Sequence, residues 1–205
     1  PATNLHAVPD EISTLEATFI EPLAAAIRIT QQIAPPQDMR VLLVGMGKLG
    51  SLVAKVFKQK GYAVSIAVRN KEKIPSLEKA GYYPILNKEV PKRSWDIAVD
   101  CTGNPAGFSV ALNGLKPMGT LVLKSTYDGL VNADLTQAVV DEISIVGSRC
   151  GPVEDAISLL RDKQISVADL VSATYSLGKA LDAIEESKRR GVLKVIVEIS
   201  KETGN

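Results

Sequence analysis

The chain has 205 residues, and its 45% of hydrophobic side chains is enough for an ordinary globular core. Its 24 basic and 23 acidic side chains leave a net charge of +1, and neither sign forms a run that would indicate a nucleic-acid partner. No apolar run reaches the roughly 18 to 20 residues that span a bilayer, and the opening residues lack the pattern of a secretory signal, so we expect a cytoplasmic protein with no membrane partner.

Helical patterns occupy the N-terminal segment, residues 1–36. Ser13-Thr14-Leu15-Glu16 has the spacing of a capping box, which predicts a helix beginning near its second residue. Pro22 should break or kink that helix, and the Ala-rich stretch 23–29 should resume it until Pro35 stops it. A simple nucleotide-binding unit does not require this segment, so we assign it to the side of a second domain.

Strands and helices alternate through residues 37–165. The predicted strands are 41–44, 63–68, 83–86, 95–100, 119–123 and 143–148, and the predicted helices between them are about 49–59, 71–80 and 105–115. Such alternation requires crossover connections and a parallel sheet with helices on both faces. The sequence therefore predicts an α/β fold, a Rossmann doubly wound six-stranded sheet, in which a ligand lies beyond the carboxyl ends of the strands.

The last part of the chain exceeds what such a sheet needs. After Gly151-Pro152 the pattern predicts a helix to about Lys163, an extended or mixed stretch at 167–173, a helix at about 178–190 and a strand at 193–199. We assign residues 166–205 to a C-terminal segment that returns to the side of the second domain.

A G-x-G-x-x-G motif, Gly45-Met46-Gly47-Lys48-Leu49-Gly50, joins the first predicted strand of the sheet to a helix. In this context the first glycine makes a tight turn, the second lets the backbone approach a pyrophosphate, and the third lets the helix pack on the strand. The diphosphate would lie at the helix N-terminus, where free N–H groups favour negative charge. The alternative is a glycine turn used only for packing; no Gly-Lys-Ser/Thr ends the loop, so it is not a Walker A motif.

The residues about 20 positions after the motif indicate which dinucleotide binds. An NAD-binding chain carries Asp or Glu there for the ribose hydroxyls, whereas this chain has Val68-Arg69-Asn70. A guanidinium can pair with a 2′-phosphate that a carboxylate would repel. We therefore expect NADP(H), with NAD less favoured; the alternative is that Arg69 is a solvated charge at the end of a strand.

Few other residues suggest chemistry. His6, the only histidine, lies outside the predicted cofactor turns, and we expect it at the surface or between elements rather than in a proton relay. Cys101 and Cys150 lack C-x-x-C spacing, so we expect buried, inert thiols in a reducing compartment. The acidic pairs 154–155 and 185–186 fall on predicted helices and suggest solvated helix faces.

Several stretches together carry a resemblance to a known family. Besides the glycine motif they are Val8-Pro9-Asp10-Glu11, Phe19-Ile20-Glu21-Pro22-Leu23-Ala24, Asp100-Cys101-Thr102-Gly103, Pro117-Met118-Gly119-Thr120 and Arg190-Gly191-Val192-Leu193-Lys194-Val195. With them the chain resembles the cofactor-binding and C-terminal part of medium-chain, zinc-type alcohol dehydrogenases. That resemblance implies hydride transfer between an alcohol carbon and the nicotinamide, with zinc acting as a Lewis acid.

The resemblance also implies roles for single residues. It gives Glu21 a place beside the zinc, Lys194 a contact with the pyrophosphate, and Thr102, Ser125 and Ser148 places in turns that line the cofactor. From the residues alone, Glu21 could simply belong to the interrupted helix, and Lys194 could be a solvated charge at a sheet edge.

The resemblance further implies that this chain lacks most of the catalytic domain, which carries the zinc and most of its ligands in the family. We then expect a fragment that binds cofactor but is inactive alone, with an alcohol, polyol-like or carbonyl compound as substrate of the whole enzyme. Relatives commonly pair through the edge strand of the sheet, which makes a homo-oligomer possible. Two alternatives stay open, a nucleotide-sensing regulatory Rossmann module and a zinc-independent quinone-type reductase.

Overall fold

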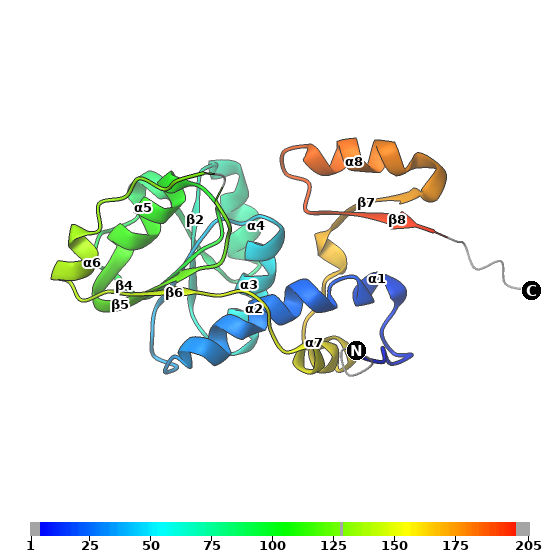
Figure 1. Cartoon of the computed structure of the whole chain (residues 1–205), viewed down its shortest axis with the longest axis horizontal. Coiled ribbons are helices and arrows are strands. Elements are labelled where there is room, and N and C mark those ends of the chain that lie inside the picture. Colours follow the sequence, from blue (N-terminus) through cyan, green and yellow to red (C-terminus); the bar gives the residue numbers. More distant parts are fainter. Residues whose placement is uncertain (1–4, 128, 200–205) are drawn as a thin grey trace, which may run out of the picture.

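The computed structural model describes residues 5–127 and 129–199, and its main feature is a parallel sheet of six strands in the order β3-β2-β1-β4-β5-β6 (Figure 1). The strands are β1 Val41–Val44, β2 Val64–Val68, β3 Tyr83–Leu86, β4 Trp95–Asp100, β5 Leu115–Leu123 and β6 Ser144–Gly147. This is the strand order of the doubly wound dinucleotide-binding fold. The predicted fold class is confirmed.

Helices cover both faces of this sheet. They are α1 Thr14–Ala17, α2 Ile20–Ile33, α3 Lys48–Gln59, α4 Ile74–Lys79, α5 Pro105–Gly114, α6 Thr136–Val140, α7 Val153–Arg161 and α8 Ala180–Lys188, with short 3-10 turns η2 Lys71–Lys73, η3 Asn87–Glu89, η4 Ala168–Leu170 and η5 Leu177–Lys179. The α2, α3 and α7 helices share one apolar cluster with one side of the sheet, and α5 packs on the other side. None of the helices in the described ranges combines the length and apolar character needed to cross a membrane.

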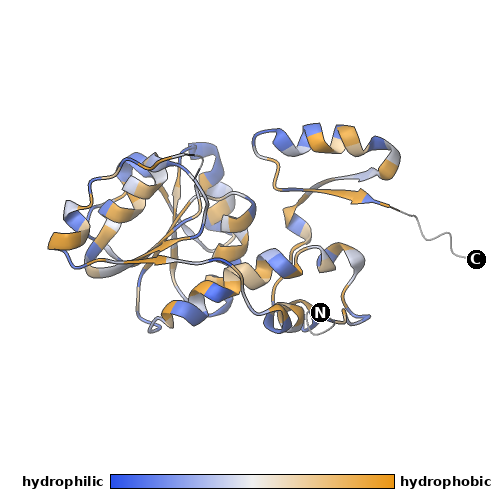
Figure 2. Ribbon diagram, in the orientation of Figure 1, coloured by the Kyte–Doolittle hydropathy of each residue, from blue (hydrophilic) through white to orange (hydrophobic). Residues whose placement is uncertain are grey.

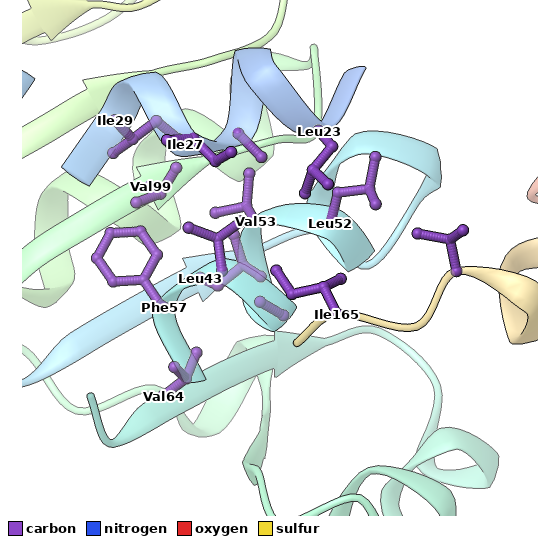
Figure 3. Packing of buried hydrophobic residues seen from close by; sticks show 14 of the residues in the cluster. Leu23, Ile27, Ile29, Leu43, Leu52, Val53, Phe57, Val64, Val99 and Ile165 are labelled. Atoms are coloured by element: carbon purple, nitrogen blue, oxygen red, sulfur yellow. The ribbon is translucent and has the colours of Figure 1, made fainter. Parts of the chain in front are cut away.

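The core lies where α2 and α3 cross the first strand. Leu23 and Ile27 of α2 meet Phe57 of α3 and Leu43 of β1 in one cluster, and all four side chains are at most 2% exposed (Figure 3). Every residue of β1 is buried, because helices lie against both of its faces. The helix α2 belongs to the segment that the sequence places outside the nucleotide-binding unit, yet it packs directly on that unit.

The predicted capping box is present at the start of α1. The Ser13 N–H donates to Glu16 Oε2 at 2.9 Å, and the Glu16 N–H donates to Ser13 Oγ at 3.2 Å. The break near Pro22 is also present, but this proline lies in the first turn of α2 rather than inside a helix. That position suits proline, because a first-turn N–H has no partner within the helix.

The C-terminal segment forms a second, two-stranded parallel sheet. Its strands are β7 Val171–Ser176 and β8 Lys194–Glu198, and α8 connects them. In Figure 1 this β7-α8-β8 unit lies beside the six-stranded sheet, with α2 and α7 below the gap between the two ribbons. The boundaries 36/37 and 165/166 that the sequence suggests remain predictions.

Candidate functional site

The three glycines of the motif have different surroundings. Gly45 has φ +98°, and a Cβ there would lie 2.9 Å from Thr102 Cγ2; a Cβ on Gly50 would lie 2.0 Å from the carbonyl oxygen of Gly45. Both positions thus need glycine for the chain's own packing. A Cβ on Gly47 would meet no atom within 4 Å. The open space at Gly47 is what a closely approaching ligand requires, and packing alone does not explain it.

This turn presents the N-terminus of α3 to the open space. Gly47 is the N-cap residue and provides no side-chain hydrogen bond, while its carbonyl oxygen accepts from the Ser51 N–H at 3.0 Å and from Ser51 Oγ at 2.9 Å. The first residue of the helix is Lys48, a cation at the positive end of the helix dipole. That placement is unfavourable unless an anion binds there.

A cleft of about 800 Å³ opens beside this turn. Its walls are the carboxyl ends of β5 and β6, the starts of α2 and α3, and the start of β8. Six of the residues predicted as site residues line it: Glu21, Lys48, Leu49, Ser125, Ser148 and Lys194. The structure therefore brings together side chains that are up to 173 positions apart in the chain (194 − 21).

A smaller hollow of about 290 Å³ is lined by the turn itself and by the carboxyl ends of β2 and β4. The predicted site residues that line it are Gly45, Met46, Gly47, Arg69, Asn70 and Thr102. Gly50 lines neither space, because it is packed against Gly45. The chain segment 190–193, which leads into β8, completes this hollow and contributes Arg190.

Three cationic side chains line the smaller hollow. Arg69 is accompanied by Lys73 and by Arg190, and all three residues are exposed. Asn70 caps the 3-10 turn η2: its Oδ1 accepts from the Glu72 N–H at 3.3 Å, and its Nδ2 donates to Glu72 Oε2 at 2.9 Å. This cap holds the loop that carries Arg69. Sequence reasoning missed Lys73 and Arg190, although Lys73 is only four positions after Arg69.

The end of β4 carries a hydrogen-bonded group that the sequence did not suggest. The buried carboxylate of Asp100 accepts from the Thr102 N–H at 2.8 Å and from Thr102 Oγ1 at 2.7 Å, and the Tyr127 hydroxyl donates to its second oxygen. Burial and this hydrogen bond raise the pKa of Tyr127. Asp100 thereby fixes the Thr102 turn and ties it to the loop after β5.

The two cysteines differ, which corrects one expectation. Cys101 is only partly buried and lines the smaller hollow, but desolvation raises the pKa of its thiol to about 12, which keeps it protonated. Cys150 is exposed rather than buried, because it lies in the connection between β6 and α7 and not inside an element.

Lys194 is half-buried at the start of β8. Its ammonium donates to the Thr18 carbonyl oxygen at 2.5 Å and lies 4.4 Å from the centroid of the Phe19 ring. Burial lowers the pKa of this lysine. Lys194 thus joins β8 to the junction of α1 and α2 at the wall of the cleft, and its contact with a pyrophosphate remains a prediction.

Lys124, the residue after β5, is a cleft residue that sequence reasoning missed. It is 7% exposed, and its ammonium donates to the Arg149 carbonyl oxygen at 2.5 Å and to Ser148 Oγ at 3.4 Å. The sequence does contain a signal that could have indicated this residue, because Lys124 stands directly between an apolar strand and the predicted cofactor turn at Ser125. Burial lowers the pKa of Lys124.

A zinc site is not assembled by the residues of this chain that the structure describes. Glu21 lines the cleft, but no group of three or more His, Cys, Asp or Glu side chains is placed to hold a metal within the described ranges. Zinc in proteins takes three or four protein ligands, so one carboxylate does not fit. His6 contacts Glu154 of α7 at 3.1 Å and lines neither space, in agreement with its predicted structural position.

Comparisons with known proteins agree with this geometry. A family model described as zinc-binding dehydrogenase matches residues 49–162. Sorbitol dehydrogenase of Gallus gallus is 27% identical over 212 residues, which cover 96% of this chain and 60% of that protein. The chain thus spans about three-fifths of the length of this curated relative.

Solved structures show the same fold. A putative zinc-binding dehydrogenase from Sinorhizobium meliloti bound to NADP has a TM-score of 0.87 at 20% identity, covering 97% of this chain and 64% of that one. A short chain alcohol dehydrogenase from Escherichia coli complexed with NADH has a TM-score of 0.85 at 21% identity, covering 97% and 64%.

Proposed function

This chain belongs to the zinc-binding dehydrogenase family, and we propose that it binds NADP(H) as the cofactor-binding portion of an enzyme that transfers hydride between nicotinamide and an alcohol or polyol. One observation carries the proposal: the open space at Gly47, at the uncapped N-terminus of α3, lies between two hollows lined by polar and cationic residues. A dinucleotide has the matching parts, a diphosphate with a ring system on either side.

The smaller hollow supports a 2′-phosphate on the adenosine half. Arg69, Lys73 and Arg190 line it, and no acidic side chain of the described ranges does. A guanidinium pairs with a phosphate through two charge-assisted hydrogen bonds, and each further cation adds attraction. NAD lacks this phosphate, so three cations in one hollow favour NADP(H).

The larger cleft would then receive the nicotinamide half. When bound, the nicotinamide supplies the hydride carrier. The parts of this chain position it: Lys48 and the α3 N-terminus attract the diphosphate, Leu49 and Leu123 offer apolar surface, and the hydroxyls of Ser125 and Ser148 can accept or donate hydrogen bonds.

The described residues do not by themselves complete a catalytic centre. Glu21 is one carboxylate at the cleft wall, and one carboxylate does not make a zinc site. We therefore propose that this chain binds cofactor and turns over little or no alcohol alone. Its substrate within the whole enzyme would be a small alcohol, polyol or carbonyl compound.

The test is a titration of the 205-residue chain with NADPH and with NADH, followed by nucleotide fluorescence. We expect saturable binding with NADPH the tighter ligand. Arg69→Gln should weaken NADPH about ten- to hundredfold, since charge-assisted hydrogen bonds contribute about 1.5–3 kcal/mol, and should leave NADH unchanged.

The matched control is Arg161→Gln, because Arg161 lies on α7, pairs with Asp162 and lines neither hollow. It should change neither affinity. No saturable binding of either nucleotide would overturn the proposed function, and NADH binding at least as tight as NADPH would overturn the preference for NADP(H).

A further inference from the structure

The larger cleft carries more positive charges than the diphosphate of a dinucleotide needs. Among residues 5–127 and 129–199, four cationic side chains line it, Lys48, Lys124, Arg149 and Lys194, against one carboxylate, Glu21. The diphosphate of the proposed cofactor accounts for two of them, Lys48 beside the glycine turn and Lys194 at the start of β8. Two cations at the carboxyl ends of β5 and β6 remain without an assigned ligand, Lys124 and Arg149.

Lys124 is built into the cleft wall and does not lie free on the surface. It is 7% exposed, and its two hydrogen-bond acceptors, the Arg149 carbonyl oxygen and Ser148 Oγ, are uncharged. No carboxylate of residues 5–127 or 129–199 forms a salt bridge with it. An ammonium has three N–H donors, so one remains for a ligand.

Glu21 on the opposite side of the cleft favours the charge of Lys124 but does not form a salt bridge with it. A buried cation without a directly bound counter-ion is costly, because the protein interior replaces its hydration only in part. An anion in the cleft would remove that cost. The nicotinamide carboxamide and a simple polyol are both neutral, so neither can form a direct ion pair with Lys124. The guanidinium of Arg149, whose backbone carbonyl already holds Lys124, lines the same wall and adds a second positive group for the same anion.

We propose that Lys124 and Arg149 bind an anionic group, a carboxylate or a phosphate, on the compound that reacts with the nicotinamide. The substrate class is then a hydroxy or carbonyl compound that carries such a group. This inference rests on the proposed function, because it places the nicotinamide half in the same cleft. Lys124 is a substrate-binding and positioning residue in this account, and Arg149 supports it from the exposed rim.

The experiment uses the 15N-labelled 205-residue chain saturated with NADP+, observed by two-dimensional NMR. Three probes are added in turn: glycolate, inorganic phosphate and neutral ethylene glycol. Glycolate and phosphate distinguish a carboxylate from a phosphate ligand. We expect at least one of them to shift the backbone amides of Ser125, Ser148 and Arg149 saturably, and ethylene glycol to leave them unchanged.

Substitutions then identify the groups that bind. Lys124→Met should weaken the anion about ten- to hundredfold, as expected for the loss of a charge-assisted hydrogen bond. Arg149→Met, at an exposed position, should weaken it by a smaller factor without affecting the fold. Lys79→Met is the control, because Lys79 is an exposed lysine of α4 outside the cleft, and it should have no effect.

The two proposals fail separately. Absence of NADP+-induced shifts at Gly45–Gly50 counts against the proposed function, while anion shifts at Ser148 and Arg149 that Lys124→Met removes would still support the anion site. Anion shifts confined to Gly47 and Lys48, or equal affinity in wild type and Lys124→Met, would overturn the anion site even if NADPH binds.

Discussion

The six-stranded sheet and the β7-α8-β8 unit are built from the same strand-helix-strand pattern, but they bury very different amounts of surface. All four residues of β1 are buried, whereas β7 and β8 contain no buried residue. In α3 seven of twelve residues are buried, against only Ala183 in α8. A hydrophobic pattern thus predicts an element in both regions, but only the large sheet has helices on both faces to bury it.

The less buried region nevertheless contributes to the site. The cleft is lined at the start of β8 by Leu193, Lys194 and Val195. The helix α8 instead exposes the apolar side chains Leu181 and Ile184, and Figure 2 shows apolar and polar segments side by side along it. The large sheet supplies the rigid turn, and the small unit supplies one wall. The following experiments test this division from the largest expected effect to the smallest.

Truncating apolar side chains should separate the two regions most strongly. Phe57→Ala in the core should lower the free energy of unfolding by about 3–5 kcal/mol, because it leaves a cavity among residues that cannot collapse onto it. Leu181→Ala, at a position 79% exposed, should change it by no more than about 0.5 kcal/mol. Urea denaturation measures both, and equal losses would contradict the contrast.

Alanine at two glycines of the motif should separate fold from ligand binding. Gly50→Ala should destabilise the chain by about 1–3 kcal/mol or more, because its Cβ would lie 2.0 Å from the Gly45 carbonyl oxygen. Gly47→Ala should leave thermal stability nearly unchanged, since its Cβ meets nothing, and should weaken NADPH binding. A Gly47→Ala chain that binds NADPH normally would show that the open space is not used.

Removing Lys194 should loosen the small unit and leave the large sheet intact. Lys194→Met loses the hydrogen bond to the Thr18 carbonyl oxygen and the contact with Phe19. This loss should lower the free energy of local opening by about 1–2 kcal/mol. Hydrogen exchange should become faster in β8 and stay unchanged in β1. Lys188→Met, which removes only an exposed pair with Glu185, serves as the control.

The capping box should give the smallest effect, and one that depends on pH. The hydrogen bonds from Ser13 lower the pKa of Glu16 from 4.5 to about 2, with Lys163 adding a further contribution. Because the folded pKa is lowered, this stabilisation is present above pH 4.5 and is lost as the pH falls toward 2. Glu16→Gln should remove that dependence on pH. At neutral pH it should lower the free energy of unfolding by less than about 1 kcal/mol, because solvent screens the charge. Unfolding of both forms between pH 2 and 6 measures it, and parallel curves would contradict the assignment.

Sequence patterns predicted most of the fold, because strand and helix periods are local properties. The doubly wound parallel sheet followed from the alternation of elements, and the capping box followed from four consecutive residues. The helix α6 was missed, since its five residues contain no buried position and so give no amphipathic pattern.

The site was less predictable, because it depends on which strand ends meet. Lys124 and Ser148 are 24 positions apart and become neighbours only when β5 pairs with β6. The exposure of Cys150 likewise depends on the path of a connection, which composition does not fix. The Tyr127–Asp100 hydrogen bond required the loop after β5 to fold back over β4.

The hydrogen bond from Lys194 to Thr18 has a consequence for the order in which the molecule is made. It joins residues 176 positions apart; Lys194 lines the cleft, and Thr18 directly precedes the lining residue Phe19. On the ribosome the six-stranded sheet can assemble well before β8 emerges. Until then the cleft lacks the wall that residues 193–195 form. We therefore expect full nucleotide binding only after β8 has been made, and a chain shortened before β8 would keep its glycine turn yet lack one wall of the cleft.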